Sequence, residues 1–553
     1  MDNLQNKKLA NLLFGDVTLT KDDLEKKFPR RNKDLVVTRF APSPTGFLHI
    51  GGVYTALIDR KIATQNNGVF FLRIEDTDKK REVPNSKEII VNIFNRLGIK
   101  IDEGVTGKET QKGSYGSYIQ SERVEIYHVL AKYLVEKGYA YPCFCTEDEL
   151  NQIREEQTAL KVSPGYYGKW AKYRDCDYET VAKLINEGKP YVLRFRVPEN
   201  SKERVGINDL IKGEIEMDNN QNDFVLLKED GIPTYHFAHA CDDHLMGTTH
   251  LFRGDEWVSS LPIHLQLFEA LEYPLPRFGH VAPIMKLDGE SRRKLSKRKD
   301  PESSAEYYLQ EGYPIRALYV YLYTLINSNF EEWYLNNQDA DLDDFTFTYE
   351  AMSTTGALYD LDKLKNISSE IIYKLKPEEN AKNCLEWAKE FDNRAYNLMA
   401  GNPDLLQRLF ETQGPNSKEN RKDMSHYSEF MDIFGLFYND IFDNDGIDYT
   451  KDLLENVKPE ELDFVVDTLI THFTNVKNGS EETLKNVSDA LGYTNKKKYE
   501  KNPENYRGVI FQFYHLIRIA LTHKTQGIGL DDIIECLGYD EVIRRLNKLK
   551  GRN

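Results

Sequence analysis

The stretch LVVTRFAPSPTGFLHIGG, residues 35–52, decides the fold of this chain. Its first six residues, Leu35–Phe40, are mostly apolar or β-branched and run into a loop rich in Pro and Gly, which predicts a buried strand followed by a loop. A helical pattern from Val53 to about Thr64 comes next, and then a second strand-like run, Val69–Ile74. Strands that alternate with helices at this spacing predict an α/β fold with a doubly wound, Rossmann-like parallel sheet.

The same alternation continues and then breaks. Ser86 is placed to cap a helix with a 3.6-residue apolar period, and Gly98 is placed to end it. At 553 residues the chain exceeds what one hydrophobic core usually holds, so we expect several domains. From the changes in pattern we predict an N-terminal arm (1–34), the first half of the α/β domain (35–114), an inserted domain (115–223), the second half of the α/β domain (224–299), a following domain (300–375) and a helical C-terminal domain (376–553).

Composition places the chain among ordinary globular proteins, with 40% hydrophobic and 29% charged residues. No run approaches the roughly 18 apolar residues that a membrane span needs, and the N-terminal segment, which contains acidic residues and no long apolar run, lacks the features of a signal or transit peptide. Six cysteines in so long a chain are typical of a reducing compartment, so we expect a cytoplasmic protein. The net charge of −16 disfavours nucleic-acid binding, but basic clusters in two predicted loops, 292–299 and 496–498, leave room for a basic face.

The loop after the first strand is a candidate anion site. A helix that begins directly after a sheet strand presents free backbone N–H groups and a positive dipole end to an anion. His49 is placed to donate to a phosphate, and Gly51 and Gly52 allow a ligand to approach the backbone closely. Two glycines after a strand are also explained by tight packing of helix on strand, and they do not form the G-x-G-x-x-G pattern of a dinucleotide site.

A second candidate is Lys294-Leu-Ser-Lys-Arg298, in a stretch rich in Asp, Gly, Ser and basic residues. Lys294 and Lys297, with Ser296 between them, form a flexible cationic clamp suited to a polyphosphate, because each ammonium acts as a mobile point charge. Taken alone, such a stretch is more often a solvated loop than a site.

Taken together, TGFLHIGG at 45–52 and KLSKR at 294–298 resemble the two signature motifs of class I aminoacyl-tRNA synthetases. Further stretches resemble the glutamyl-tRNA synthetase family, in its order, over nearly the whole chain from about Val36. These stretches are RFAPSPTGFLHIGG (39–52), FLRIEDTD (71–78), YHFAHACDDHLMG (235–247), LFRGDEW (251–257), GALYDLDKL (356–364) and ALTHKTQGIGLDDIIECLG (520–538). The resemblance implies a glutamate–tRNA ligase of bacterial type, which forms glutamyl-adenylate with ATP and transfers glutamate to the 3′ end of tRNA.

Three alternatives fit the residues less well. A glutaminyl-tRNA synthetase has a Pro-Glu-Pro-Asn core where this chain has Ala41-Pro-Ser-Pro-Thr45, and it lacks RIEDTD. A small glutamyl-queuosine relative ends soon after the KLSKR motif, whereas this chain continues to residue 553. A catalytically dead tRNA-binding paralogue is disfavoured because His49, Gly51 and both lysines of the clamp are intact.

The resemblance also implies roles for individual residues. Arg39 would bind the side-chain carboxylate of glutamate, which suits a guanidinium fork, and His239 departs from the small apolar residue or Asn usual in the family. Arg73, Asp76 and Asp78 are equally well explained as a loop of satisfied ion pairs, and we leave them out of the site. The expected glutamate-binding residues are Arg39, Ser43, Glu75, Tyr235 and Arg253; those for ATP are His49, Gly51, Gly52, Lys294, Ser296 and Lys297, of which His49, Lys294 and Lys297 are expected to be catalytic.

The resemblance implies partners as well. We expect ATP as a substrate with Mg²⁺, L-glutamate, and tRNA(Glu) with tRNA(Gln) as a second candidate, bound by a monomer through acceptor-binding (115–223), stem-contact (300–375) and anticodon-binding (376–553) domains. We expect no zinc. Relatives pair a Cys-x-Cys with a later Cys and His, but here Trp170 and Lys172 stand where those ligands would fall, and a closed zinc site needs four ligands. Cys143 and Cys145 are therefore predicted to be core cysteines, with Cys176 the remaining candidate ligand.

Overall fold

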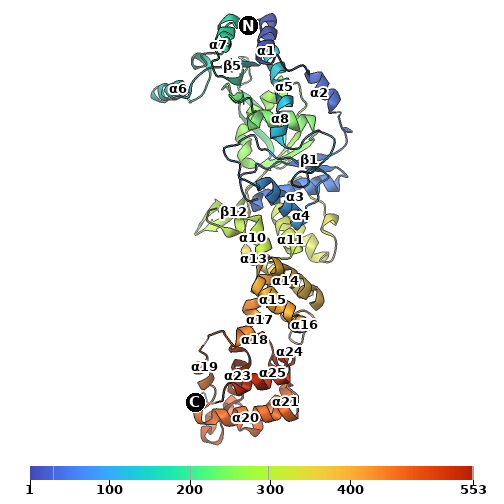
Figure 1. Cartoon of the computed structure of the whole chain (residues 1–553), viewed down its shortest axis with the longest axis vertical. Coiled ribbons are helices and arrows are strands. Elements are labelled where there is room, and N and C mark those ends of the chain that lie inside the picture. Colours follow the sequence, from blue (N-terminus) through green and yellow to red (C-terminus); the bar gives the residue numbers. More distant parts are fainter. Residues whose placement is uncertain (29, 200, 297, 447, 551–553) are drawn as a thin grey trace. The chain divides into compact units, whose positions relative to one another are not determined.

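The computed structural model describes residues 1–28, 30–199, 201–296, 298–446 and 448–550, and the chain divides into two compact units (Figure 1). Unit 1 comprises Met1–Tyr307 and Leu322–Asp360, and unit 2 comprises Tyr308–Tyr321 and Leu361–Asn553. Within the described ranges no helix is long and apolar enough to cross a membrane.

Unit 1 is built on a parallel sheet. Strands β1 (Val37–Phe40), β2 (Val69–Leu72) and β3 (Glu103–Val105) run parallel in that order, and β4 (Gln111–Lys112) closes the edge antiparallel. Beyond β1 lies a second parallel pair, β10 (His250–Gly254) and β11 (Arg277–Val281). The N–H of Thr249 donates to the carbonyl of Val37 at 3.0 Å, which joins the two groups of strands. The predicted α/β fold with a parallel sheet is confirmed.

Helix α3 (Ile50–Gln65) makes the crossover from β1 to β2 and packs on β1, β2 and β10. All four side chains of β1 are buried, as the apolar run predicts. Helix α8 (Tyr235–Leu245) packs against α5 (Val124–Glu136) and α9 (Leu261–Ala270), and residues 237–245 of α8 are all buried. Because α8 is buried on every side, its charged residues need partners inside the protein.

The helix expected after Ser86 is α4 (Ser86–Leu97), and Gly98 ends it with φ 71°, as predicted. The capping role given to Ser86 was wrong. Asn85 occupies the N-cap position without a side-chain cap bond, and the Ser86 hydroxyl donates instead to the carbonyls of Pro44 and Val83. Ser86 therefore ties the start of α4 to the loop that follows β1.

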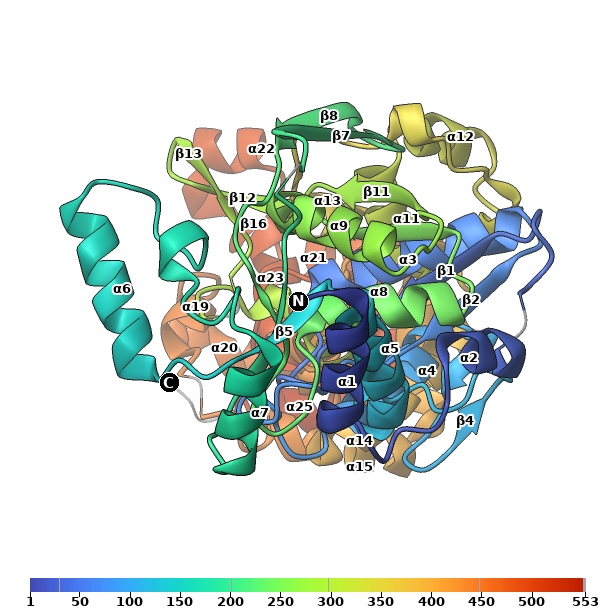
Figure 2. The ribbon, with the colours of Figure 1, turned by 90° about the horizontal axis from the view of Figure 1, so that it is seen from above.

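The N-terminal arm is firmly attached to unit 1. Its helix α1 (Asn3–Leu13) lies beside α5 and α7 (Tyr178–Asn186), as Figure 2 shows, and α2 (Lys21–Lys27) also packs on α5. Farther along the arm, Arg31 makes a two-pronged ion pair with Glu103 of β3, at 2.9 and 2.7 Å, and donates to the carbonyl of Met246 at 3.2 Å.

The segment predicted as an insertion contributes two small antiparallel sheets. One joins β5, β6 and β9, so that β9 pairs with strands of the inserted segment, and the other is the hairpin of β7 and β8. The remaining bounds in unit 1 are β5 Ala140–Cys143, α6 Glu147–Ala159, β6 Val192–Phe195, β7 Arg204–Asp209, β8 Gly213–Asp218, β9 Val225–Leu227, β12 Ile284–Asp288, β13 Ser291–Lys294, α12 Phe330–Asn336 and β14 Ala357–Leu358. The predicted domain limits stay predictions.

Unit 2 is mainly helical around one large hydrophobic core, in line with the helical pattern expected after Lys299. Helices α10 (Ala305–Gln310) and α11 (Ile315–Ile326) each include residues of both units. The others are α13 Leu361–Lys374, α14 Pro377–Phe391, α15 Asn393–Gly401, α16 Pro403–Glu411, α17 Phe430–Phe434, α18 Asn439–Phe442, α19 Thr450–Leu454, α20 Pro459–Asn475, α21 Glu481–Ala490, α22 Lys496–Lys501, α23 Ile510–Thr522, α24 Leu530–Leu537 and α25 Tyr539–Asn547, with strands β15 Tyr493–Thr494 and β16 Gly508–Val509.

The two basic clusters do not lie in plain loops. Lys496–Lys498 opens helix α22, because the side chain of Asn495 accepts the N–H of Lys498 and caps it. Arg292 and Arg293 lie on strand β13, which pairs antiparallel with β12 to form a hairpin. The described residues of this cluster that follow Lys294 lie outside the hairpin.

Candidate active site

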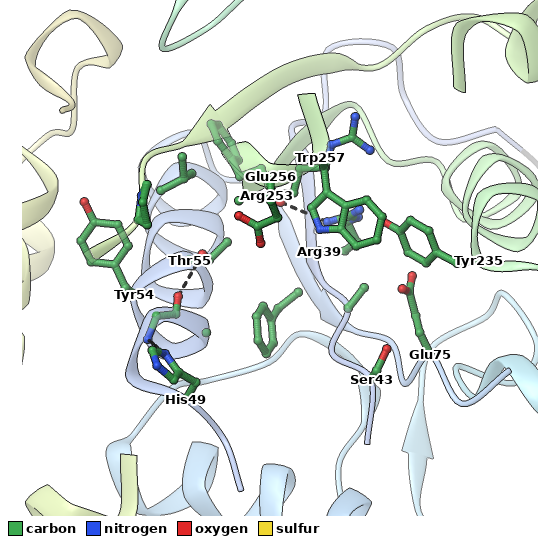
Figure 3. A pocket seen from close by; sticks show the side chains of 18 of the residues that line it. Arg39, Ser43, His49, Tyr54, Thr55, Glu75, Tyr235, Arg253, Glu256 and Trp257 are labelled. Carbon is green, nitrogen blue, oxygen red and sulfur yellow. Dashed lines mark hydrogen bonds between the residues drawn. The ribbon is translucent and has the colours of Figure 1, made fainter. Parts of the chain in front are cut away.

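A cavity of about 650 Å³ lies in unit 1 at the carboxyl ends of β1 and β10, beside the start of α3 (Figure 3). This is the edge of a parallel sheet at which ligands usually bind. In Figure 3, Tyr235, Glu75 and Ser43 lie on one side of the cavity, and His49, Tyr54 and Thr55 lie on the other. Nine of the residues predicted for the site line it: Arg39, Ser43, His49, Gly51, Gly52, Glu75, Tyr235, Arg253 and Lys294.

Two predicted residues stand apart. Ser296 does not line the cavity; its N–H is bound instead by the carboxylate of Asp300 at 2.8 Å. Lys297 lies outside the described residues. Lys294 lines the cavity with a side chain that is 58% exposed, and its ammonium lies 3.9 Å from Asp255 and 3.8 Å from Glu256. Because this ammonium is exposed and only loosely paired, it is available to a polyphosphate.

His49 occupies the N-cap of α3, and its Nδ1 accepts the N–H of Gly51 at 2.9 Å. The neutral ring therefore carries its proton on Nε2, the nitrogen suited to donate to a phosphate oxygen. The N–H of Gly52 donates to the carbonyl of His49 at 2.8 Å. The N–H groups of both glycines are thus used to close the first turn of the helix, and they are not among the free donors that a helix start presents to an anion.

The two glycines matter through their lack of a side chain. A Cβ at residue 51 would lie 3.0 Å from Nδ1 of His49, and one at residue 52 would lie 3.1 Å from Leu48 and 3.2 Å from Phe40. Either methyl group would push on its neighbours. At residue 51 the displaced group would be the imidazole itself, so Gly51 preserves the orientation of His49.

Arg39, at the end of β1, is 4% exposed. Its Nε and Nη2 donate to the two carboxylate oxygens of Asp243 at 3.2 and 3.4 Å, and its Nη1 donates to the carbonyl of Phe252 at 3.1 Å. One edge of the guanidinium fork is thus held by the protein, which leaves two of its five N–H groups for a ligand.

Asp243 is the centre of the buried charges around the cavity. Besides Arg39 it binds Arg73 at 2.8 Å, and Nδ1 of His239 lies 2.7 Å from its other oxygen. Burial alone would raise the pKa of Asp243, but Arg39 and Arg73 hold that pKa well below its usual value, so the carboxylate is ionised. Arg73 also binds Glu75 at 2.8 Å. Asp243 thereby fixes Arg39 in the cavity wall and Arg73 behind it.

Sequence reasoning left Asp243 and Arg73 out of the site. A signal was present, because Tyr235, His239 and Asp243 follow one another at intervals of four and share one face of α8. Trp257 was also missed; its ring lies 4.3 Å from that of Tyr235, between centroids, and lines the cavity.

Arg253 differs from the other arginines because its contacts are histidines. Its Nε donates to Nε2 of His280 at 3.1 Å, and its Nη1 contacts Nδ1 of His264 at 2.9 Å and Nε2 of His239 at 3.5 Å. Its Nη2 is buried without a hydrogen-bond partner, and among the described residues no carboxylate forms an ion pair with it. On this side the carboxylate of Asp209 binds Nδ1 of His280 at 2.6 Å and not Arg253.

The histidines around Arg253 are neutral. Burial lowers the pKa of His239 to about 4, lowers that of His264 well below its usual value, and lowers that of His280. Burial also lowers the pKa of Arg253, although a guanidinium remains charged in proteins. Arg253 is therefore a buried positive charge, 5% exposed, surrounded by neutral acceptors. His239 stacks on Tyr235 at 5.6 Å and stands behind the cavity rather than in it.

The candidate metal ligands lie apart from this cavity. Cys143 is buried and Cys145 is half-buried against the same small core, and both sulfurs lie within hydrogen-bond distance of the Tyr166 hydroxyl. Cys176 contacts the carbonyl of Lys172. In the part of the chain that the structure describes, no three His, Cys, Asp or Glu side chains are grouped as metal ligands. The absence of zinc stays a prediction.

Comparison with protein families matches two domains. The catalytic domain of class I tRNA synthetases for glutamate and glutamine (E and Q) matches residues 35–364, and an anticodon-binding domain matches residues 383–550. The first match includes every residue that lines the cavity.

Comparison with single proteins covers nearly the whole chain. A glutamate–tRNA ligase of Clostridium perfringens (strain SM101 / Type A) is 43% identical over 547 residues, covering 98% of each chain. A glutamate–tRNA ligase of Bacillus subtilis (strain 168) is 33% identical over 93% of this chain and 99% of its own. The crystal structure of a glutamate–tRNA ligase from Elizabethkingia meningosepticum CCUG26117, in complex with its amino acid, superposes with a TM-score of 0.75 at 28% identity, covering 93% of this chain and 98% of that one.

Proposed function

This chain belongs to the class I tRNA synthetases for glutamate and glutamine, and from that premise we propose that it is a glutamate–tRNA ligase. It uses ATP to convert L-glutamate to glutamyl-adenylate and transfers the glutamyl group to the 3′ end of tRNA. The acceptor is tRNA(Glu), with tRNA(Gln) as a second candidate.

The observation that carries the choice of glutamate is the buried charge around the cavity. We count the buried charged groups that line the cavity or pair with a lining side chain. Three of them are arginines, Arg39, Arg73 and Arg253, and two are carboxylates, Glu75 and Asp243. Burial raises the pKa of Asp59, a further buried acid beside this cluster, well above the usual value, and the carboxylate of Asp209 pairs with His280 rather than with an arginine. Counted over the lining side chains and their direct ion-pair partners, buried guanidinium groups therefore outnumber buried carboxylates by one.

Glutamate compensates this excess, because it brings two carboxylates and one ammonium. Glutamine is neutral overall and would leave the excess charge buried and unpaired, and its NH2 would oppose the guanidinium donors. We assign the distal carboxylate of glutamate to Nη2 of Arg253 and to the two N–H groups of Arg39 that Asp243 and Phe252 do not use.

The α-ammonium and α-carboxylate groups of glutamate are assigned to a second wall in the same half of the cavity. Glu75 is buried beside Arg73 and lines the cavity, so it is suited to the α-ammonium, while Ser43 is exposed there and suited to the α-carboxylate. Tyr235 covers this pocket with its ring held between His239 and Trp257. The rigid rings exclude water from the substrate side chain, which strengthens its electrostatic contacts.

The opposite half of the cavity is assigned to ATP. The Nε2–H of His49 and the ammonium of Lys294 supply donors and charge for the phosphates. Gly51 and Gly52 allow the phosphates to approach the backbone closely. Ser296 and Lys297 are assigned to ATP from the sequence alone. Two exposed carboxylates, Asp78 and Glu256, line the cavity. Such an arrangement fits Mg²⁺ that arrives bound to ATP, because Mg²⁺ is usually held by one or two carboxylates together with substrate phosphates and not by protein ligands alone. When bound, it would neutralise phosphate charge.

The reaction requires no covalent enzyme nucleophile. The α-carboxylate of glutamate attacks the α-phosphorus of ATP, the bond to the bridging oxygen breaks, and pyrophosphate leaves. A terminal hydroxyl of tRNA then attacks the activated carbonyl and AMP leaves. The residues described here act by positioning the two substrates and by stabilising phosphate charge, which are large effects in such reactions.

The test is charging of tRNA. Purified protein, with ATP, Mg²⁺ and labelled glutamate, is expected to acylate tRNA(Glu), and the ester is expected to be labile to mild alkali. Parallel reactions with tRNA(Gln) distinguish the two acceptor assignments. A protein that binds tRNA but neither charges it nor catalyses glutamate-dependent exchange of pyrophosphate into ATP would be a non-catalytic paralogue, and the proposal would be wrong.

A further inference from the structure

Asp300 lies two residues beyond the KLSKR stretch and is 3% exposed, yet it does not line the cavity. None of the roles assigned above uses it. A buried carboxylate is costly unless it is fully paired, so its partners indicate what it holds.

On one side Asp300 closes the loop that carries Ser296. Its Oδ2 accepts the N–H of Ser296 at 2.8 Å, and its own N–H donates to the carbonyl of Ser296 at 3.0 Å. Two hydrogen bonds therefore join the same two residues through side chain and backbone. Lys294, which lines the cavity, is only two residues before Ser296.

Asp300 also anchors the hairpin of β12 and β13. Arg293 donates from Nη1 to Oδ2 at 2.6 Å and from Nη2 to Oδ1 at 2.9 Å, and Lys286 donates to Oδ1 at 3.2 Å. The hydrogen bonds from Arg293 are the main reason that the pKa of Asp300 lies well below its usual value. The ionised carboxylate thus binds both strands of the hairpin whose end is Lys294.

The chain after Asp300 leads to the other phosphate-facing segment. A 3₁₀ turn, Pro301–Ser303, is followed by Ser304, which forms a β-bridge with His49. The N–H of Ala305 donates to the carbonyl of Leu48 at 2.9 Å. A short continuous segment therefore connects the hairpin of Lys294 to the loop of His49.

We propose that Asp300 is a positioning residue for adenylate formation, because it fixes the hairpin that bears Lys294 relative to the loop that bears His49. Asp300 does not contact the substrate in this proposal, which rests on the proposed function. Both donors must reach the same triphosphate, and displacing a catalytic group by about 1 Å costs on the order of 10²-fold in rate. The pocket for glutamate is held by other contacts, centred on Asp243, and is independent of Asp300.

The experiment measures glutamate-dependent exchange of pyrophosphate into ATP, with tRNA present, in wild type, Asp300→Asn and Asp288→Asn. Asp288 is the matched control, since it accepts from Nε of the same Arg293 at 2.8 Å but does not bind the Ser296 backbone. Asp300→Asn is expected to lower kcat/KM for ATP about 10- to 100-fold, with KM for glutamate within about twofold of wild type. Asp288→Asn is expected to match wild type both in kcat/KM for ATP and in KM for glutamate.

Arg293→Gln provides a second variant, at a position whose side chain is less buried than that of Asp300. It removes two donors from Asp300 and is expected to change the same constant in the same direction by a smaller factor. The proposal is overturned if Asp300→Asn keeps its kcat/KM for ATP, if KM for glutamate rises in parallel, or if Asp300→Asn fails to fold while Arg293→Gln behaves as wild type. An inactive wild type would instead refute the proposed function.

Discussion

Replacing Arg253 by glutamine removes the buried guanidinium that no carboxylate compensates in the protein alone. In the complex, the distal carboxylate of glutamate would then face a neutral amide in a site shielded from water. Truncating one partner of a buried charge pair typically costs about 2–5 kcal/mol, which corresponds to a loss in kcat/KM for glutamate of roughly 30-fold to several thousand-fold. The loss is expected mainly in KM for glutamate, with KM for ATP nearly unchanged.

The stability of the same variant should move differently from its activity. Wild type carries the desolvation penalty of Arg253 without an ion pair in return. Glutamine removes that penalty but takes a donor from His264 and His280, at roughly 1 kcal/mol each. These terms nearly offset, so Arg253→Gln is expected to melt at or above the wild-type midpoint.

Arg39→Gln is the contrast within the same cavity, because Arg39 has a carboxylate partner. Breaking a buried pair costs about 3–5 kcal/mol when it strands a charge, and Arg73 still holds Asp243, so a loss of roughly 2 kcal/mol is expected. Thermal melting and exchange kinetics on both variants make the test. If Arg253→Gln keeps its affinity for glutamate, or if it is the less stable of the two variants, the proposal that the unpaired Arg253 binds the distal carboxylate of glutamate is refuted.

Other predictions concern pH, metal and the clamp. Burial lowers the pKa of His239 to about 4 and lowers that of His264 as well, whereas the same side chains take up protons near pH 6.5 in the unfolded chain. The free energy of unfolding should therefore fall as pH drops from 6.5 towards 5, and a flat melting profile there would contradict neutral histidines. Elemental analysis is expected to find no stoichiometric zinc, whereas one zinc per chain would show that Cys143 and Cys145 have further ligands. Lys297→Ala is expected to lower turnover about 10²–10³-fold, and a near-normal rate would remove Lys297 from the mechanism.

Local patterns were sufficient to predict the elements that position the site. The run Leu35–Phe40, the loop after it and the helix after that loop are each defined by residues close in sequence, so periodicity and turn residues predict them, although the helix begins at Ile50 rather than at the predicted Val53. The errors were local too: Asn85 rather than Ser86 lies at the N-cap, and Asn495 starts a helix where a basic loop was expected.

The buried network was beyond such patterns. Asp243 joins Arg39 and Arg73, residues that are 204 and 170 positions away in the chain, and only the folded sheet brings them together. The same holds for Arg253, because the groups that surround its guanidinium in the fold come from other segments and cannot be read from the motif in which it lies. Resemblance to a family identified nine of the residues that line the cavity, but the residues that hold them required the three-dimensional arrangement.

The central claim is that one excess buried positive charge selects glutamate. It is tested most directly by measuring kcat/KM for glutamate and for glutamine in pyrophosphate exchange, with tRNA present and with the same enzyme preparation. A site that leaves a buried charge unpaired against the wrong substrate can discriminate by about 10⁴–10⁵ without editing, so glutamate is expected to be preferred by at least about 10³-fold. Comparable use of glutamine would contradict the account.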